Sequence, residues 1–498
     1  MKKIILLSLF LGWIILPLSA QIKIDFKELT LDNQIKIDFK EFTLDNGLHV
    51  IMHQDNTTPI VLTSVLYHVG SKNENPERTG FSFLINNHLY FEGFENIESG
   101  QYSKIIENRG GSPGYRIDQD ISYYFEELPS NELDLALYME SERMLHAKVG
   151  LTGVETQLKL IELRIKRDED RPYGSVLSET LKRAYTMHPY QWGNFGSMDH
   201  LYAAPIEEFQ RFYKDFYVPN NATLTIAGDI DYVTTESMVR KYFSEIPKGT
   251  KPVYRPEITE PKKTTEVRDI IYDNIQTPMV IQAYNLPERN HPDSHALSML
   301  STYLTDGESS LMYKELVDKQ QKALQVNSFL FEREDGGLFM IEGITNMGVE
   351  AKDVEAEKKQ LMSKQVMSKE EHDKLMKLLG DNMYLDNKLG VDPKELDTEI
   401  DRLIKQVQDQ GISDEEFTKL KNIMENRFVR RISELSGIAE NLAEGKVIYG
   451  NTNYINQVME AYAKVTKEDI QRVAKTYLDL TGRVVLYCLS KSDKPVSE

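Results

Sequence analysis

The chain has a single cysteine, Cys488, among 498 residues, so no intrachain disulfide can form and a cluster of thiolate metal ligands is excluded. It also has a deficit of positive charge: 59 lysines and arginines stand against 78 acidic residues, which gives a net charge of −19. A chain this acidic is repelled by a nucleic-acid backbone or an anionic membrane surface, so neither is expected as its main partner.

Motifs for several common chemistries are absent as well. No Gly-x-x-x-x-Gly-Lys-Ser/Thr loop is present to hold nucleotide phosphates, and no Gly-x-Ser-x-Gly turn to present a serine nucleophile. No apolar run approaches the length of about 20 residues that an integral membrane span needs. What remains is a composition of 40% hydrophobic and 28% charged residues, which is typical of a globular protein with two to four domains.

The first 20 residues read as a secretory signal peptide. Lys2 and Lys3 precede an apolar stretch at residues 4–16, and the segment ends on small residues at Ser19 and Ala20. We therefore predict export to the periplasm or the extracellular space, with retention as an uncleaved anchor as the alternative.

A 13-residue unit occurs twice after this segment, as QIKIDFKELTLDN at residues 21–33 and QIKIDFKEFTLDN at residues 34–46. Only the second copy leads into Gly47 and the alternating residues 48–53, a pattern that predicts a β-hairpin. We interpret residues 21–34 as a duplicated N-terminal arm. The alternative is an arm that adds a strand to a partner protein.

The rest of the chain predicts an α+β fold in two halves. Helical periodicity at residues 133–148 and 153–167 alternates with strand-like runs at residues 61–67, 121–127 and 222–230. A segment rich in proline and lysine predicts a linker at residues 248–268 between domains at residues 35–247 and 269–492. A strand, a polar loop and a helix recur after Tyr67 and after Tyr284, which indicates homologous domains. The second domain also contains a duplicated helical pair near residues 348–421.

Two windows carry the residues that suggest a chemistry: YHVGSKNENPERTGFSFLINNHLYFEG at residues 67–93 and ETQLKLIELRIKRDEDRPYG at residues 155–174. They resemble the pitrilysin/insulinase family of zinc metallopeptidases, in which H-x-x-E-H on a helix is followed about 75 residues later by a glutamate. The resemblance extends over nearly the whole chain after residue 20. It implies two homologous domains, each a mainly antiparallel sheet packed with helices, in a clamshell arrangement.

The slots of this motif are not filled by the family's residues. Counted forward from Phe81, they hold Phe83, Asn86 and Asn87. Counted back from Phe91, they hold Leu84, Asn87 and His88, because the segment is one residue longer than the family's spacing. An apolar side chain cannot bind zinc, and an amide cannot accept a proton near neutral pH. We therefore assign no catalytic residue to the motif.

His88 and Glu162 are the vestigial candidates for metal ligands. Together they would supply two ligands, whereas a catalytic zinc site has three protein ligands and a water molecule. One helical residue is about 100° of rotation, so Asn87 and His88 cannot both face the site without a bulge. We expect no cofactor, and zinc only if this degenerate site still binds it.

The resemblance also indicates where a peptide would bind. The family's substrate strand, N-A-x-T, falls on Gly114, Tyr115, Arg116 and Ile117, where the asparagine and the threonine are missing. The family's arginine and tyrosine of the second domain, which contact the substrate, fall on Val317 and Leu324.

Three interpretations follow. The first is the non-catalytic subunit of a heterodimeric zinc endopeptidase that acts on peptides, paired with a sister chain that has an intact zinc motif. The second is an active zinc endopeptidase with an atypical site. The third is a peptide-binding or scaffold protein that uses the same fold without a proteolytic partner.

Overall fold

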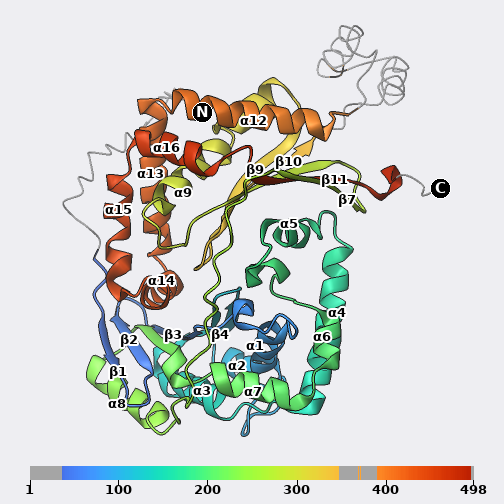
Figure 1. Cartoon of the computed structure of the whole chain (residues 1–498). Coiled ribbons are helices and arrows are strands. Elements are labelled where there is room, and N and C mark those ends of the chain that lie inside the picture. The colour runs from blue at the N-terminus through green and yellow to red at the C-terminus, as the bar shows by residue number, and fades with distance from the viewer. Residues whose placement is uncertain (1–35, 347–367, 369–370, 372–389, 495–498) are drawn as a thin grey trace, which may run out of the picture. The chain divides into compact units, whose positions relative to one another are not determined.

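The computed structural model describes residues 36–346, 368, 371 and 390–494 (Figure 1). The predicted signal peptide, the duplicated arm and most of the first copy of the helical pair lie outside these residues. Residues Ile37–Glu498 form one unit of the chain, and the description below is of that unit.

The first half builds a six-stranded sheet in the order β1-β2-β6-β3-β5-β4. Strands β2 and β6 run parallel, and the other neighbours pair antiparallel. The predicted hairpin is confirmed: β1 pairs with β2, and Gly47 between them has a φ of 90°, a conformation that favours glycine. The strands are β1 (Lys40–Thr43), β2 (His49–Gln54), β3 (Ile60–Tyr67), β4 (Ser112–Ile117), β5 (Ser122–Pro129) and β6 (Ala222–Gly228).

The second half builds a five-stranded sheet in the order β7-β11-β8-β10-β9. Its one parallel pair, β7 with β11, corresponds to β2 with β6 of the first sheet. The order β11-β8-β10-β9 then corresponds to the order β6-β3-β5-β4. This repetition confirms two homologous domains in an α+β fold. The strands are β7 (Val267–Asp273), β8 (Met279–Asn285), β9 (Ala323–Phe331), β10 (Leu338–Thr345) and β11 (Arg483–Ser490).

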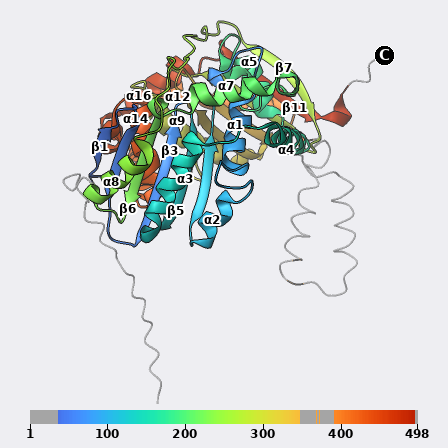
Figure 2. The same ribbon diagram turned by 90° about the horizontal axis from the view of Figure 1, so that it is seen from below.

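Helices of each half cover one face of that half's own sheet. Figure 2 shows α8, α3 and α2 across the first sheet, where buried apolar side chains of sheet and helices form one core. Helices α9, α12 and α16 pack on the second sheet in the same way. The helices of the first half are α1 (Phe81–Phe91), α2 (Tyr102–Asn108), α3 (Leu133–Leu145), α4 (Leu151–Glu169), α5 (Val176–Ala184), α6 (Met198–Ala203), α7 (Ile206–Phe216) and α8 (Tyr232–Phe243). Those described in the second half are α9 (Ser294–Thr305), α12 (Pro393–Gln410), α13 (Asp414–Arg431), α14 (Leu435–Val447), α15 (Val458–Lys464) and α16 (Lys467–Tyr477).

The opposite face of each sheet is covered by a helix from the other half. Leu435 and Ala439 of α14 pack on Leu62 and Ala227 of the first sheet. Conversely, α5 packs on β7, β8 and β11 of the second sheet (Figure 1). Each sheet therefore has two apolar faces, which explains why their central strands read as continuous hydrophobic runs and not as alternating patterns.

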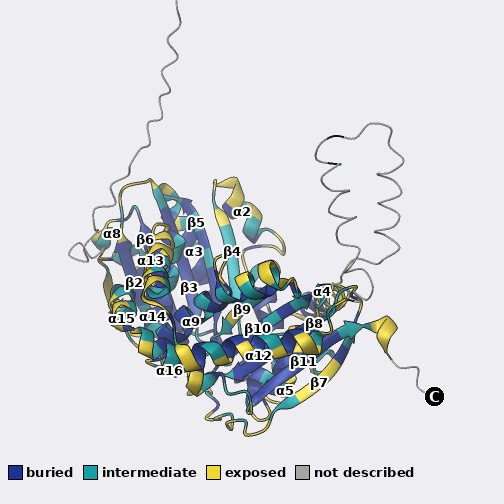
Figure 3. Ribbon diagram, turned by 90° about the horizontal axis from the view of Figure 1, so that it is seen from above, coloured by how far each residue is buried: buried dark blue, intermediate teal, exposed yellow. Residues whose placement is uncertain are grey.

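Burial follows this architecture (Figure 3). The central strands are buried, whereas β7 lies at the edge of its sheet with exposed residues along it. Cys488 is buried in β11, and in the second copy of the helical pair Ser413 caps α13 by accepting a hydrogen bond from the Glu416 amide. Within the described residues, no helix is long and apolar enough to cross a membrane. The domain boundaries set from the sequence stay predictions.

Candidate functional site

The degenerate motif lies on α1, which is a continuous helix from Phe81 to Phe91. A buried carboxylate holds its first turn: Glu74 accepts hydrogen bonds from the amides of Gly80 at 2.8 Å and Ser82 at 2.7 Å. Burial raises the pKa of Glu74 to about 8, although these amide hydrogen bonds oppose the rise. Because the helix contains no bulge, the extra residue of the segment rotates every later side chain by one helical position.

The residues of the two alternative alignments differ in whether they face a cavity. Phe83 and Asn87, one helical turn apart, both line a cavity of about 400 Å³ between α1, α4 and β4. Leu84 and His88 are fully buried and do not line it. Of the slots counted forward from Phe81, Phe83 and Asn87 face the cavity and Asn86 is buried, whereas of those counted back from Phe91 Asn87 alone faces it.

At the position of the first histidine of the family motif, an aromatic ring and a cation occupy the site. The Phe83 ring meets the Phe195 ring edge-on, with 4.7 Å between the centroids. The Arg164 guanidinium lies 5.2 Å from the centroid of Phe83 and 5.8 Å from that of Phe195, in cation–π contact. A guanidinium at this place repels a second cation, so its charge opposes zinc binding.

The two asparagines carry neither a metal ligand nor a base. The Asn87 amide donates to the Phe83 carbonyl at 2.7 Å and accepts from the Tyr115 hydroxyl at 3.0 Å. Asn86 is fully buried, and neither its amide nitrogen nor its amide oxygen has a hydrogen-bond partner among the described residues. Leaving such a group unpaired costs about 1–3 kcal/mol, so Asn86 is a strained remnant in an otherwise well-packed helix.

His88 is directed away from the cavity. Its Nε2 lies 2.7 Å from the Lys148 carbonyl, to which it donates, and its Nδ1 has no partner among the described residues. Burial lowers the pKa of His88, so the ring is neutral near pH 7. The ring packs on α4 at Gly153, where a Cβ atom would lie 2.6 Å from the His88 Cε1.

Glu162 is exposed on α4, and its carboxylate accepts a hydrogen bond from the Tyr202 hydroxyl at 2.8 Å. The structure therefore does not bring the two vestigial candidates together, because His88 and Glu162 have different partners and Glu162 does not line the cavity. Nor does Glu162 pair with Arg164. No group of three histidine, cysteine, aspartate or glutamate side chains suited to a metal occurs in the described part of the chain. These residues do not fit a catalytic zinc ion.

The predicted substrate strand is β4, the edge strand of the first sheet. Tyr115 lines the cavity, and Gly114 packs so closely on the Phe125 ring that a Cβ atom would lie 2.3 Å from it. Arg116 instead forms ion pairs with Glu440 at 3.0 Å and Glu444 at 2.5 Å on α14. Ile117 closes the strand by pairing with Ser122. Of the four predicted residues, Tyr115 is the one that the cavity exposes to a ligand.

The sequence interpretation missed the α4 side of this cavity. Exposed Leu160 and Leu163 and the two arginines Arg164 and Arg167 form that wall, together with Phe91 of α1. These α4 residues recur at intervals of three and four, which places them on one helical face. In the second half, Val317 packs against the core and Leu324 is exposed on β9.

The fold and the site define a class: a two-domain peptidase-like protein with a cavity between α1, α4 and β4. Known proteins agree with this class. Residues 49–193 match the family described as insulinase (peptidase family M16), and residues 204–379 match the one described as peptidase M16 inactive domain. The chain belongs to the pitrilysin/insulinase family, peptidase family M16.

Individual relatives are similar over most of their length. The zinc protease PqqE of Helicobacter pylori is 29% identical over 449 residues, which cover 89% of this chain and 90% of that protein. A crystal structure of a protease from Helicobacter pylori superposes with a TM-score of 0.78 at 23% identity, covering 92% of this chain and all of the other. The peptidase M16 inactive domain from Pseudomonas fluorescens gives a TM-score of 0.74 at 15% identity, over 93% of this chain and all of the other.

Proposed function

We propose that this protein is an exported, non-catalytic member of the family that binds extended peptides and acts as the silent subunit beside a zinc-bearing sister chain. The observation that carries the proposal is the donor set of α1. At the slots where the family places two histidines and a glutamate, α1 carries Phe83, Asn87 and the buried Asn86, and the Arg164 guanidinium of α4 lies over the Phe83 ring. None of these binds zinc or accepts a proton from water.

Two features support peptide binding. Among the described strands, the edge strand β4 pairs with β5 alone, so its other edge can add a peptide strand. Beside it, the cavity offers an apolar wall of exposed Leu160 and Leu163 and the ring of Phe91. A peptide strand along β4 can thus place an apolar side chain against α4.

The charges of the cavity favour an acidic group next to that side chain. Arg164 and Arg167 both line it, and no ion pair of the described residues involves either of them. Although the chain as a whole is strongly acidic, the cavity is locally positive. The proposed ligand is therefore a peptide segment with an apolar residue near a carboxylate.

The loss of catalysis is tested by zinc content and activity together. Elemental analysis of wild type and His88→Ala after dialysis against trace zinc is expected to give far less than one zinc per chain in both. The pure protein is expected to show no chelator-sensitive peptidase activity. Stoichiometric zinc that disappears in the His88→Ala variant would overturn the proposal in favour of an active peptidase with an atypical site.

Peptide binding is tested by fluorescence anisotropy with labelled unstructured peptides. Leu163→Glu puts a carboxylate into the cavity wall and is expected to weaken binding by about tenfold or more, through lost apolar contact. Leu151→Glu is the matched control, because Leu151 lies on the same helix with 61% exposure against 63% for Leu163 and does not line the cavity. Equal effects of the two substitutions would locate the binding site elsewhere.

The partner is tested by mixing. A sister chain of the family with an intact H-x-x-E-H motif is expected to form a complex with this chain in size-exclusion chromatography and to gain peptidase activity from it. If such a chain neither binds this protein nor changes its activity, the third interpretation remains: a peptide-binding or scaffold protein without a proteolytic partner.

A further inference from the structure

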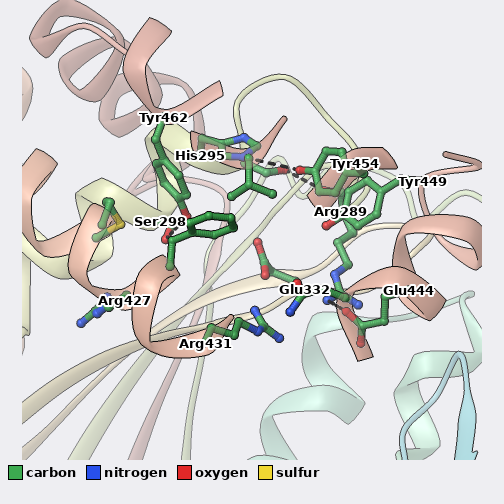
Figure 4. A pocket seen from close by; sticks show the side chains of 15 residues that line it. Arg289, His295, Ser298, Glu332, Arg427, Arg431, Glu444, Tyr449, Tyr454 and Tyr462 are labelled. Carbon is green, nitrogen blue, oxygen red and sulfur yellow. Dashed lines mark hydrogen bonds and ion pairs between the residues drawn. The ribbon is translucent and has the colours of Figure 1, made fainter. Parts of the chain in front are cut away.

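A second cavity, of about 280 Å³, lies in the other half of the chain (Figure 4). Its walls come from α9, α13, α14 and α15, and from the residues that follow β9. None of its lining residues lines the cavity beside Phe83. A volume at the lower end of the range for ligand pockets suits a small molecule and not a folded segment.

Most charged side chains of this cavity are already satisfied by the protein. Arg289 pairs with Glu444 at 2.7 Å. Arg427 pairs with Asp306 at 2.7 Å and donates to the Thr302 hydroxyl at 2.9 Å. These ion pairs hold the walls in place, although the Arg289 Nε has no hydrogen-bond partner among the described residues.

Two further charged groups of opposite sign line the cavity, Glu332 and the half-exposed Arg431. The Glu332 carboxylate has no ion pair or side-chain hydrogen bond among the described residues, although it lines the cavity. The closest carboxylate to the Arg431 guanidinium is that of Glu440 at 3.8 Å, beyond hydrogen-bonding distance. Glu332 and Arg431 do not pair with each other within 4.0 Å, yet Figure 4 shows both directed into the same space.

The rest of the lining combines aromatic and apolar side chains with the polar Ser294, Ser298 and Asn441. The rings of Tyr449 and Tyr454 stack with 3.8 Å between their centroids, and Tyr462 meets His295 edge-on at 4.6 Å. Buried Met424, with Phe428 and Val458, supplies the apolar part. Tyrosine faces also favour a nearby ammonium group through their negative quadrupole.

We propose that this cavity binds a free α-amino acid with an aliphatic side chain, its ammonium group on Glu332 and its carboxylate on Arg431. A zwitterion is the ligand that satisfies one carboxylate and one guanidinium at once. A purely anionic ligand would leave Glu332 unpaired beside it, and a purely cationic ligand would face three arginines. The aliphatic side chain packs against Met424 and Phe428. This binding is independent of the proposed role beside a peptidase.

The first test uses the wild-type chain and three probes that differ only at the charged ends: L-leucine, L-leucinamide and N-acetyl-L-leucine. Isothermal titration calorimetry is expected to detect leucine binding. Blocking either end removes a charge-assisted hydrogen bond and is expected to weaken binding by about tenfold or more. Absence of leucine binding, or leucinamide binding as tight as leucine binding, would overturn the proposal.

The second test uses variants with matched controls. Glu332→Gln and Arg431→Gln are each expected to weaken leucine binding by about tenfold or more. Glu308→Gln and Arg430→Gln change the net charge equally at exposed positions that do not line the cavity, and are expected to bind leucine as wild type does. Equal loss in variants and controls would overturn the site. Circular dichroism confirms the fold of each variant, and if one does not fold, the three-probe comparison on wild type decides alone.

Discussion

Lys72 is a nearly inaccessible cation that joins the two halves of the chain, and replacing it should have a large effect on stability. Its side chain is 2% exposed and lies 3.1 Å from Asp120 of the first half. It also lies 2.5 Å from Glu334 and 2.9 Å from Asp335, both in the loop between β9 and β10 of the second half. One ammonium group thus neutralises carboxylates from both halves.

Lys72→Met keeps a side chain of similar length and removes the charge. Because the carboxylates stay behind without their cation, the free energy of unfolding is expected to fall by about 3–5 kcal/mol, the cost of breaking a buried ion pair by removing one partner. Lys405→Met is the control: its pair with Asp409 is 61% and 56% exposed, so a loss of about 0–1 kcal/mol is expected.

Urea denaturation followed by tryptophan fluorescence measures this difference. Trp13 lies in the predicted signal peptide, so Trp192 is the single tryptophan of the chain from residue 21 onward. Its indole donates to the Ser71 carbonyl at 3.2 Å, next to Lys72, and therefore reports on this contact between the halves.

The pH dependence gives an independent check. Although burial raises the pKa of both Glu334 and Asp335, the neighbouring histidines and Lys72 lower each pKa to about 2. Carboxyl groups in an unfolded chain have pKa values of about 4, so this stabilisation is present above pH 4 and is lost as the pH falls toward 2. The gap between wild type and Lys72→Met should therefore narrow over that range. The reasoning would be refuted if Lys72→Met lowered the free energy of unfolding no more than Lys405→Met does. It would also be refuted if the difference in stability between wild type and Lys72→Met widened on acidification.

Two further substitutions test the packing around the degenerate motif. Asn86→Leu replaces an unpaired buried amide with an apolar side chain of similar size, and the free energy of unfolding is expected to rise by about 1–2 kcal/mol in urea denaturation; a fall would show that the amide is satisfied. Gly153→Ala places a methyl group against the His88 ring and is expected to lower the melting temperature through a loss of about 1–3 kcal/mol. In a His88→Ala background, Gly153→Ala should lower the free energy of unfolding only slightly. An equal loss of stability in both backgrounds would exclude the contact with the His88 ring as the cause.

Much of the fold could be predicted from the sequence. The strands at β3, β5 and β6 and the helices α3 and α4 carry clear local periodicities, and each forms within a few residues of its predicted range. The two homologous domains could also be recognised, because the same strand, loop and helix recur after Tyr67 and Tyr284. The sequence could not show that α5 covers the second sheet and α14 covers the first. A helix has the same pattern of apolar residues whichever sheet it packs on.

For the candidate site, the sequence alone predicts that the family's zinc donors are missing, since side-chain chemistry depends on residue identity and not on conformation. Only the tertiary structure placed Phe83 and Asn87 on the cavity and directed His88 away from it, because a single helical residue changes the direction of a side chain by about 100°. It also decided that Arg164 lies over Phe83 and that Glu162 pairs with Tyr202. The groups that cover Phe83 and Glu162 come from α4, α6 and the loop at Phe195, far apart in the chain, and packing between distant segments has no local periodicity from which it can be predicted.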